Sequence, residues 1–336
     1  MKAVQVVAFG RPAEAVRLNE VPDVGSPGPN EVVVAVEAAP INNSDFMIIA
    51  GRYGYLPTPP ATLGIEGVGR VIAAGAQVKN LREGDRTLIP FTIPTWTERL
   101  KFTPSWQRPL PEAADIQQLS MIAVNPATAY LLLTDFVKIP RGGWVIQNGA
   151  NSATARAVIA IARSLGLKTV NIVRREEVVD EVKAVGGDIV LVDGPDLAKR
   201  VAKETGKAPI QLALDVVGGA SALNLMNCLA PKGVLVIYSA MSGQPFSGSA
   251  LSVIFNEVSV RGFWLAHWGK TATDEALATM YDHLVPMVAS GAISAPVVGS
   301  YGLEGFAEAI AKAAAFKGKV IRSEERRVGK ECRSRW

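Results

Sequence analysis

In the middle of the chain, apolar and polar residues follow the pattern of a strand, a tight turn, a helix and a second strand. The apolar run at residues 144–147 has strand length, and residues 148–152, Asn-Gly-Ala-Asn-Ser, are typical of a turn. A helix is predicted next because four apolar residues share one helical face: Val158, Ile161, Ala162 and Leu165. Gly166 stands where helices end in a left-handed residue, and residues 169–173 are a second apolar run. The segment is therefore predicted to be a βαβ unit.

The turn of this unit is a predicted anion site, because the first N–H groups of a helix lack partners and the helix dipole is positive there. The dinucleotide-binding fingerprint has three glycines, whereas this loop has Gly149 followed by small side chains at residues 150–155. After the second strand, Arg174 and Arg175 stand where enzymes that use NAD carry an acidic residue. Two guanidinium groups suit a 2′-phosphate, which predicts NADPH; the alternative is a solvated start to the next helix.

Strand and helix continue to alternate beyond this unit. Further strands are predicted at residues 189–192, 212–217, 234–238 and 258–263, with helices at 178–185 and 223–229 between them. Together with the βαβ unit this makes six strands, all predicted to be parallel, as in a doubly wound α/β sheet.

The two ends of the chain follow a different pattern. Residues 1–123 hold short β-rich runs at 2–9, 31–38 and 67–74, separated by prolines, which is typical of an irregular antiparallel barrel. Residues 116–137 are predicted to be helical, and beyond Trp268 follow a helix (275–290), a strand (297–298), an alanine-rich helix (306–316) and a last strand (319–321). We expect a nucleotide domain, residues 124–266, inserted into a discontinuous domain of residues 1–123 and 267–322, with the site in the cleft between them.

Composition and charge narrow the function classes. The 336 residues are 49% hydrophobic and 20% charged, which suits an ordinary globular protein of two domains. No run of 18 apolar residues and no signal-peptide pattern are present, so we expect no membrane association. Cys228 and Cys332 are too few for a disulfide framework, which favours the reducing cytoplasm.

The net charge of +4 is concentrated at the C-terminal end. Residues 322–336 carry six basic and three acidic side chains, a balance of +3, so the rest of the chain is near +1 and nucleic acid is not expected as a partner. Residues 323–336 show no apolar periodicity and are interpreted as a tail foreign to the fold. A native basic tail is the alternative.

Five motifs make the pattern more specific: Ile-Asn-Asn-Ser-Asp at 41–45, Gly-Arg-Tyr-Gly at 51–54, Val-Asn-Pro-Ala-Thr-Ala-Tyr at 124–130, Gln-Asn-Gly-Ala-Asn-Ser at 147–152 and Arg-Gly-Phe-Trp-Leu-Ala-His-Trp at 261–268. With them the chain resembles the medium-chain dehydrogenase/reductase superfamily over nearly all of residues 1–322. Within it, the chain is similar to zinc-free trans-2-enoyl thioester reductases of fatty acid synthesis, of the mitochondrial enoyl reductase type. The resemblance implies a Rossmann NADPH domain inserted in a GroES-like, partly β-barrel catalytic domain.

The metal ligands of the zinc-containing superfamily members are missing from this chain. Those members have a cysteine where residues 42–45 stand and a histidine where Ile65 stands. The two histidines, His267 and His283, have no cysteine at ligand spacing. We therefore expect no catalytic zinc.

The resemblance also assigns the site. The family's catalytic tyrosine matches Tyr53. The residues expected to bind NADPH are Asn125, Asn151, Ser152, Ala153, Thr154, Arg174, Arg175, Tyr238, Met241, Phe263, Trp264, Leu265 and Lys319. The family's glycines are replaced by alanine at positions 153 and 155. Alternatives from the residues alone are a turn at Asn125-Pro126, domain-interface packing for Phe263 and Trp264, and solvent exposure for Lys319.

Tyr53 suits the chemistry that this resemblance implies. When a hydride reaches the β-carbon of an enoyl thioester, negative charge collects on the thioester oxygen and the α-carbon takes a proton. A phenol, with an ordinary pKa of about 10, is protonated at neutral pH and stabilises that charge or passes on its proton. The alternative is that Tyr53, like Tyr55, packs a loop rich in proline and glycine.

Partners and competing functions complete the prediction. In related enzymes, the apolar segment at residues 251–255 lies near the subunit contact, and residues 258–263 are the edge strand expected to pair in a homodimer. The nearest alternative is an NADPH:quinone oxidoreductase, or a reductase of another activated alkene, on the same fold. A non-enzymatic structural or RNA-binding role, as in zeta-crystallin relatives, is disfavoured by the near-neutral body of the chain.

Overall fold

The structure is a computed structural model that describes residues 1–91, 93–315 and 318–323. The chain divides into two compact units. Unit 1 contains residues 1–124, 273–291 and those from 295 on, and unit 2 contains residues 125–272 and 292–294. Residues 324–336, which make up most of the predicted foreign tail, lie outside the described residues.

Unit 2 is built on a parallel sheet of six strands in the order β10-β9-β8-β11-β12-β13. The strands are β8 (Trp144–Gln147), β9 (Lys168–Val173), β10 (Ile189–Val192), β11 (Ile210–Asp215), β12 (Val234–Ile237) and β13 (Ser259–Gly262). The order reverses between β8 and β11, which is where doubly wound sheets bind dinucleotides. The predicted Rossmann sheet is confirmed.

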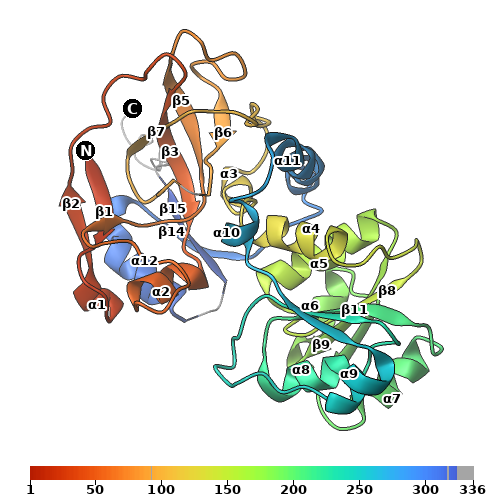
Figure 1. Ribbon diagram of the computed structural model, residues 1–336. Helices are drawn as coiled ribbons and strands as arrows, with labels where there is room; N and C mark the ends of the chain where they lie inside the picture. The colour runs from red at the N-terminus through yellow and green to blue at the C-terminus, as the bar shows by residue number, and fades with distance from the viewer. Residues whose placement is uncertain (92, 316–317, 324–336) are drawn as a thin grey trace, which may run out of the picture. The chain divides into compact units, whose positions relative to one another are not determined.

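Helices pack on both faces of this sheet: α4 and α5 lie on one side of it in Figure 1, and α8 and α9 on the other. The helices of unit 2 are α4 (Asn125–Thr134), α5 (Ala153–Ser164), α6 (Val179–Ala184), α7 (Leu197–Glu204), α8 (Gly219–Met226), α9 (Ala250–Asn256) and α10 (Leu265–Trp268), with a 3₁₀ turn at Glu176–Val178. Helix α5 buries Val158, Ile161 and Ala162 completely, as its apolar face predicts. Gly166 follows it with φ +73°, the predicted left-handed position.

Unit 1 combines the two ends of the chain in one sheet, with the strand order β14-β15-β3-β5-β6 and β7 paired to β3. Figure 1 shows β14 and β15, in blue, beside β3, in red. The strands are β3 (Val32–Pro40), β5 (Val68–Ala74), β6 (Arg86–Leu88), β7 (Arg99–Phe102), β14 (Val297–Tyr301) and β15 (Lys319–Ser323). A second sheet pairs β1 (Lys2–Val6) with β2 (Val16–Glu20) and β4 (Ala61–Thr62). The predicted discontinuous β domain is therefore confirmed.

The helices of unit 1 are α1 (Pro12–Ala15), α2 (Asn43–Ile49), α3 (Ile116–Leu119), α11 (Asp274–Ala289) and α12 (Phe306–Ala313), with a 3₁₀ turn at Leu303–Gly305. Trp96 is fully buried at the centre of the core, with its ring 4.4 Å from the ring of Phe306 on α12. Burial of a large apolar side chain of this kind stabilises a fold by about 1.5–3 kcal/mol.

Several predicted element boundaries are wrong: the strand predicted at residues 2–9 ends at Val6, and the strand predicted at 297–298 runs to Tyr301. The helix predicted over residues 116–137 is two helices, because residues 120–124 form turns between α3 and α4. The last strand runs to Ser323, two residues beyond its predicted end, because Ser323 pairs with Ala38 in the sheet. Among the described residues, no helix combines the length and apolar composition that a membrane span requires.

Candidate active site

The loop between β8 and α5 presents the N-terminus of a helix, as predicted. Gly149 has φ +56°, and a β-carbon there would lie 2.4 Å from Val216 Cγ1, so only glycine fits this turn. The Ser152 hydroxyl accepts a hydrogen bond of 3.2 Å from the Ala155 N–H and caps the helix. The N–H groups of Ala153 and Thr154 start the helix and have no intrahelical acceptor, which is the arrangement that binds phosphate.

Arg174 and Arg175 follow the carboxyl end of β9 and are exposed. Arg175 lies 3.4 Å from Glu177 in an ion pair. Arg174 has no ion pair or hydrogen bond among the residues that the structure describes, so its guanidinium is available to an anion. The absence of an acidic side chain at the end of β9 agrees with a site for a 2′-phosphate.

Asn125, the first residue of α4, carries a buried polar atom without a partner. Its Oδ1 accepts a hydrogen bond of 2.8 Å from the Thr154 hydroxyl, which joins α4 to the first turn of α5. Its Nδ2 is buried and has no acceptor within the described part of the chain. An unsatisfied buried donor costs about 1–3 kcal/mol, so a bound acceptor such as a ribose or carboxamide oxygen fits this place.

The remaining predicted cofactor residues of unit 2 lie after β12 and β13. The hydroxyl of Tyr238 is buried without a hydrogen-bond partner among the described residues, and burial raises its pKa above the ordinary value. The Met241 side chain is 58% exposed. The ring of Phe263 packs edge-on against Phe136 of the same unit at 5.9 Å, and Trp264 and Leu265 beside it are half-buried.

Tyr53 lies in unit 1, in the loop after α2. Gly51 ends that helix with φ +70°, and the Arg52 N–H donates to the Met47 carbonyl at 2.8 Å, so the start of the loop is fixed. The Tyr53 side chain is half-buried and packs against the core of unit 1. The geometry therefore holds the phenol near the surface of the unit, and its catalytic role stays a prediction.

A buried polar cluster in unit 1 includes Lys319. The Lys319 ammonium donates to Asn42 Oδ1 at 2.6 Å, and Asn42 Nδ2 donates to Glu66 Oε1 at 2.8 Å. Glu66 Oε2 accepts from the Val124 N–H at 2.8 Å, and Asp45 Oδ2 accepts from the Asn42 N–H at 2.7 Å. Lys319 is half-buried and its ammonium is held by this cluster rather than extended into solvent, while its predicted contact with the cofactor stays a prediction.

The sequence did not predict the two acids of this cluster. Asp45 and Glu66 are 0% exposed, and loss of hydration raises the pKa of each to about 7. The same burial lowers the pKa of Lys319, while the two carboxylates oppose that shift. Nothing in the local sequence signals this pairing, because Asn42 and Lys319 are 277 positions apart.

Sequence similarity to enoyl-[acyl-carrier-protein] reductases shows the family of this chain. The chain is 37% identical over 309 residues to the enoyl-[acyl-carrier-protein] reductase, mitochondrial, of Rattus norvegicus, covering 90% of this chain and 82% of that protein. The enzyme of the same name from Homo sapiens is 35% identical over the same share of both chains. The family described as "Alcohol dehydrogenase GroES-like domain" matches residues 28–102, and "Zinc-binding dehydrogenase" matches residues 154–281.

The chain belongs to the enoyl thioester reductase family of the mitochondrial type, within the zinc-free medium-chain dehydrogenases/reductases.

Solved structures agree with this family on the fold. A complex of the enoyl thioester reductase Etr1p with NADP and crotonyl-CoA is 27% identical, with a TM-score of 0.83, and covers 95% of this chain and 98% of that one; Etr1p comes from Candida tropicalis. A Bacillus thuringiensis protein assigned as an NADPH:quinone reductase is 26% identical, with a TM-score of 0.87 over 96% of this chain and 98% of that one. Both structures share the two-domain fold.

The name of the matching family "Zinc-binding dehydrogenase" directs attention to the positions of possible metal ligands in this chain. Among the described residues, no group of three or more histidine, cysteine, aspartate or glutamate side chains is arranged to hold a metal ion. At the positions where zinc-containing members carry cysteine and histidine, this enoyl reductase family member has Asn-Asn-Ser-Asp (residues 42–45) and Ile65. A lysine ammonium supplies the positive charge of the cluster around Asn42.

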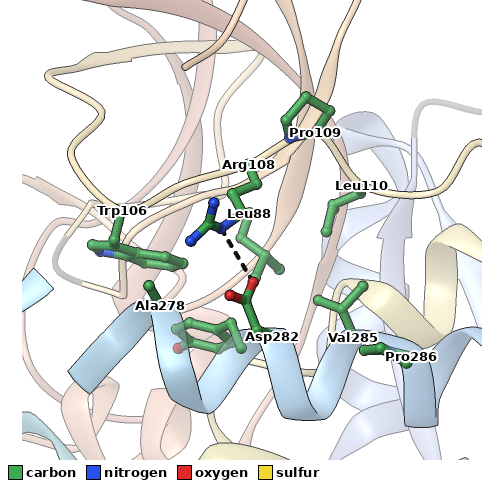
Figure 2. A pocket seen from close by; sticks show the side chains of 10 residues that line it. Leu88, Trp106, Arg108, Pro109, Leu110, Ala278, Asp282, Val285 and Pro286 are labelled. Carbon is green, nitrogen blue, oxygen red and sulfur yellow. Dashed lines mark ion pairs between the residues drawn. The ribbon is translucent and has the colours of Figure 1, made fainter. Parts of the chain in front are cut away.

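A separate pocket in unit 1 contains none of the predicted site residues. It lies between the loop at residues 106–110 and helix α11, and has a volume of about 150 Å³. Figure 2 shows Arg108 facing Asp282 across it, and the two side chains form an ion pair of 3.2 Å. The rings of Trp106 and Tyr281 stack at 4.5 Å beside this pair. The two charges that line the pocket are therefore paired with each other.

Proposed function

We propose that this protein reduces the C2=C3 double bond of trans-2-enoyl thioesters, with NADPH as the hydride donor. One observation carries the substrate class: the match over 90% of the chain to proteins named enoyl-[acyl-carrier-protein] reductase. The Etr1p complex contains NADP and crotonyl-CoA, which supports the thioester class with either coenzyme A or acyl carrier protein as the carrier.

The residues of unit 2 support NADPH as the cofactor. The N-terminus of α5 receives the pyrophosphate, and Arg174, with Arg175 beside it, receives the 2′-phosphate. The unpartnered Nδ2 of Asn125 provides a donor for an oxygen of the cofactor. When bound, NADPH supplies a hydride to the β-carbon of the substrate.

In this proposal Tyr53 stabilises or neutralises the negative charge that hydride transfer creates on the substrate. Its phenol donates a hydrogen bond to the thioester oxygen as negative charge collects there, or passes its proton to the α-carbon. No metal ion is needed when such a donor is in place.

The test of the proposal is a comparison of substrates. We expect the purified protein to oxidise NADPH with crotonyl-CoA at a kcat/KM at least 100-fold above the value with a quinone such as phenanthrenequinone. Product analysis would identify butyryl-CoA. If the protein turns over the quinone and no enoyl thioester, the thioester proposal is wrong and the quinone reductase alternative, which the Bacillus thuringiensis structure favours, takes its place.

We further propose that the protein forms a homodimer through the edge of the unit 2 sheet. Strand β13 is the last strand of that sheet, and its residues are exposed. Exposed apolar side chains stand next to it in the sequence, on α9: Leu251, Val253, Ile254 and Phe255, with exposed fractions of 65, 48, 65 and 76%. An exposed strand edge with apolar residues beside it favours pairing with a second copy. A cytoplasmic location stays a prediction.

A further inference from the structure

The loop that starts α5 has lost two of the glycines that shape a phosphate loop, yet it stands on a buried polar network. Alanine occupies positions 153 and 155, where the family has glycine. Directly below, at the carboxyl ends of β8 and β11, Asn148 and Asp215 are 1% and 0% exposed. Buried polar groups cost free energy unless they are hydrogen-bonded. The hydrogen-bond partners of these two side chains therefore identify the backbone segments that the network connects.

Asp215 is the centre of this network. A single carboxylate oxygen, Oδ1, accepts from Asn148 Nδ2 at 2.5 Å, from the Val217 N–H at 3.1 Å and from the Gly218 N–H at 2.9 Å. Hydrogen bonds to a charged acceptor are the stronger kind. The carboxylate therefore fixes the turn after β11 and attaches it to the end of β8.

Asn148 closes the link from the other side. Its Oδ1 accepts from the Val216 N–H at 2.8 Å, and its Nδ2 also donates to the Ser221 hydroxyl at 3.1 Å. Ser221 in turn donates to Asp193 at 2.6 Å, which extends the network to the end of β10. This single network of side-chain hydrogen bonds connects the carboxyl ends of β8, β10 and β11 with helix α8.

The link acts on the phosphate loop because Asn148 is the residue before Gly149. The backbone of Gly149 lies so close to Val216 that a β-carbon would come within 2.4 Å of its Cγ1. The next residue, Ala150, donates its N–H to the Ile172 carbonyl at 3.2 Å. The loop is thus held between β9 and β11. The side-chain hydrogen bonds of Asn148 to Asp215 and Val216 fix the position of the loop backbone relative to the end of β11.

We propose that Asn148 and Asp215 are positioning residues for the cofactor: they hold the backbone of the phosphate loop in its binding conformation, a task that the fingerprint assigns to glycines. The inference rests on NADPH as the cofactor of the proposed function. A loop that is already ordered loses less conformational entropy when the pyrophosphate binds. Neither residue needs to touch the cofactor.

The test measures NADPH binding rather than turnover. We expect Asn148→Ala to raise the Kd for NADPH, measured by fluorescence titration of the full-length protein, by about tenfold or more, equivalent to about 1.4 kcal/mol. The matched control is Thr97→Val, which removes hydrogen bonds of a buried hydroxyl to the Lys2 and Arg99 carbonyls in unit 1 and touches no residue of the network. The control should lower Tm by a similar amount and leave the Kd for NADPH within twofold of the wild-type value.

Ser221→Ala provides a second, milder variant if Asn148→Ala fails to fold. It removes one of the two hydrogen bonds that Asn148 Nδ2 donates and keeps the bond to Asp215, so we expect a Kd increase of about two- to fivefold. An unchanged Kd in a folded Asn148→Ala protein, or an equal increase in Thr97→Val, would overturn the proposal. An unchanged Kd in Ser221→Ala would also overturn it when that is the only folded variant. Because the measurement uses NADPH alone, a wild-type protein that binds NADPH but does not reduce crotonyl-CoA would contradict only the proposed substrate.

Discussion

At the scale of single residues, the two acids beside Lys319 differ in what their oxygens accept. Glu66 accepts a hydrogen bond at each oxygen, from Asn42 and from Val124. Asp45 accepts at Oδ2 only, and its Oδ1 is buried without a donor among the described residues. The loss of hydration is thus less compensated at Asp45, so a neutral amide should be tolerated there and not at position 66.

The pH dependence of stability tests this difference. Because burial raises the pKa of Asp45 and of Glu66 to about 7, the folded protein binds protons more tightly than the unfolded chain. Their contribution to the free energy of unfolding is therefore greatest below about pH 4 and is lost as the pH rises towards 7. We expect Asp45→Asn to flatten this slope, by up to about 1.4 kcal/mol per pH unit, and to raise Tm at pH 8.

Thermal unfolding followed by calorimetry from pH 4.5 to 8 measures this effect. Glu83→Gln, a substitution of an exposed acid, is the control and should leave the slope unchanged. Glu66→Gln should instead lower Tm over the whole range, because its amide nitrogen would face a donor. Equal slopes for the wild type and Asp45→Asn would show that Asp45 is not protonated in the folded protein near neutral pH.

Individual residues also show what the sequence does and does not predict. The position of Arg174 at the end of a strand was predicted from local sequence, because the residue directly follows the second apolar run of the βαβ unit. The pairing of Asn148 with Asp215, 67 positions away, was not predicted, since only the fold brings the two strand ends together. A carboxylate in a sequence is by default exposed, so the burial of Asp45 and Glu66 was missed as well.

At the scale of elements, we propose that the end of β9 determines the preference for NADPH over NADH. Arg174 has no partner among the described residues, so its charge is available to the 2′-phosphate, which NADH lacks. We expect Arg174→Ala to raise the Kd for NADPH by about 10- to 100-fold while changing the Kd for NADH less than threefold, because one charged hydrogen-bond partner contributes about 1.5–3 kcal/mol.

Titration of both cofactors against the wild type and the variant measures this preference. Arg17→Ala is a control for the loss of an exposed arginine, since Arg17 lies in unit 1 on β2. Equal weakening of NADPH and NADH by Arg174→Ala would remove the assignment of the 2′-phosphate to this side chain.

The edge strand β13 and helix α9 carry the prediction about assembly. We expect Phe255→Glu, which places a charge at a side chain that is 76% exposed, to convert a dimer to a monomer at micromolar concentration. Light scattering after size-exclusion chromatography measures the mass. The control Leu18→Glu changes an exposed apolar residue of unit 1 and should leave the dimer intact. A monomeric wild-type protein would contradict the homodimer.

Strong hydrophobic periodicity explains which elements the sequence predicts. The six strands of unit 2 and helices α5 and α11 were predicted, because their apolar runs are long or regular. Helices α2 and α7 were not predicted, since α2 has only seven residues and α7 buries only two of its side chains. Tertiary packing rather than local sequence fixes such short elements.

At the scale of the whole molecule, the order of elements along the chain, rather than the glycine fingerprint alone, predicted the nucleotide-binding fold. The loop at residues 149–155 fails the glycine fingerprint, and only the order of strands and helices around it indicated a nucleotide fold. The β domain, split between the two ends of the chain, was predicted from a change of pattern near Trp268. The positions of the site side chains within each unit came only from the structure.

The central proposal is that the protein uses NADPH and that the phenol of Tyr53 stabilises or protonates the negative charge that forms on the enoyl thioester. The most direct test is the turnover of crotonyl-CoA by Tyr53→Phe at saturating NADPH. We predict a kcat about 10²–10³-fold below the wild-type value, the scale expected for loss of one donor to a developing oxyanion, with the Kd for NADPH unchanged. A variant that reduces crotonyl-CoA at the wild-type rate would contradict the account.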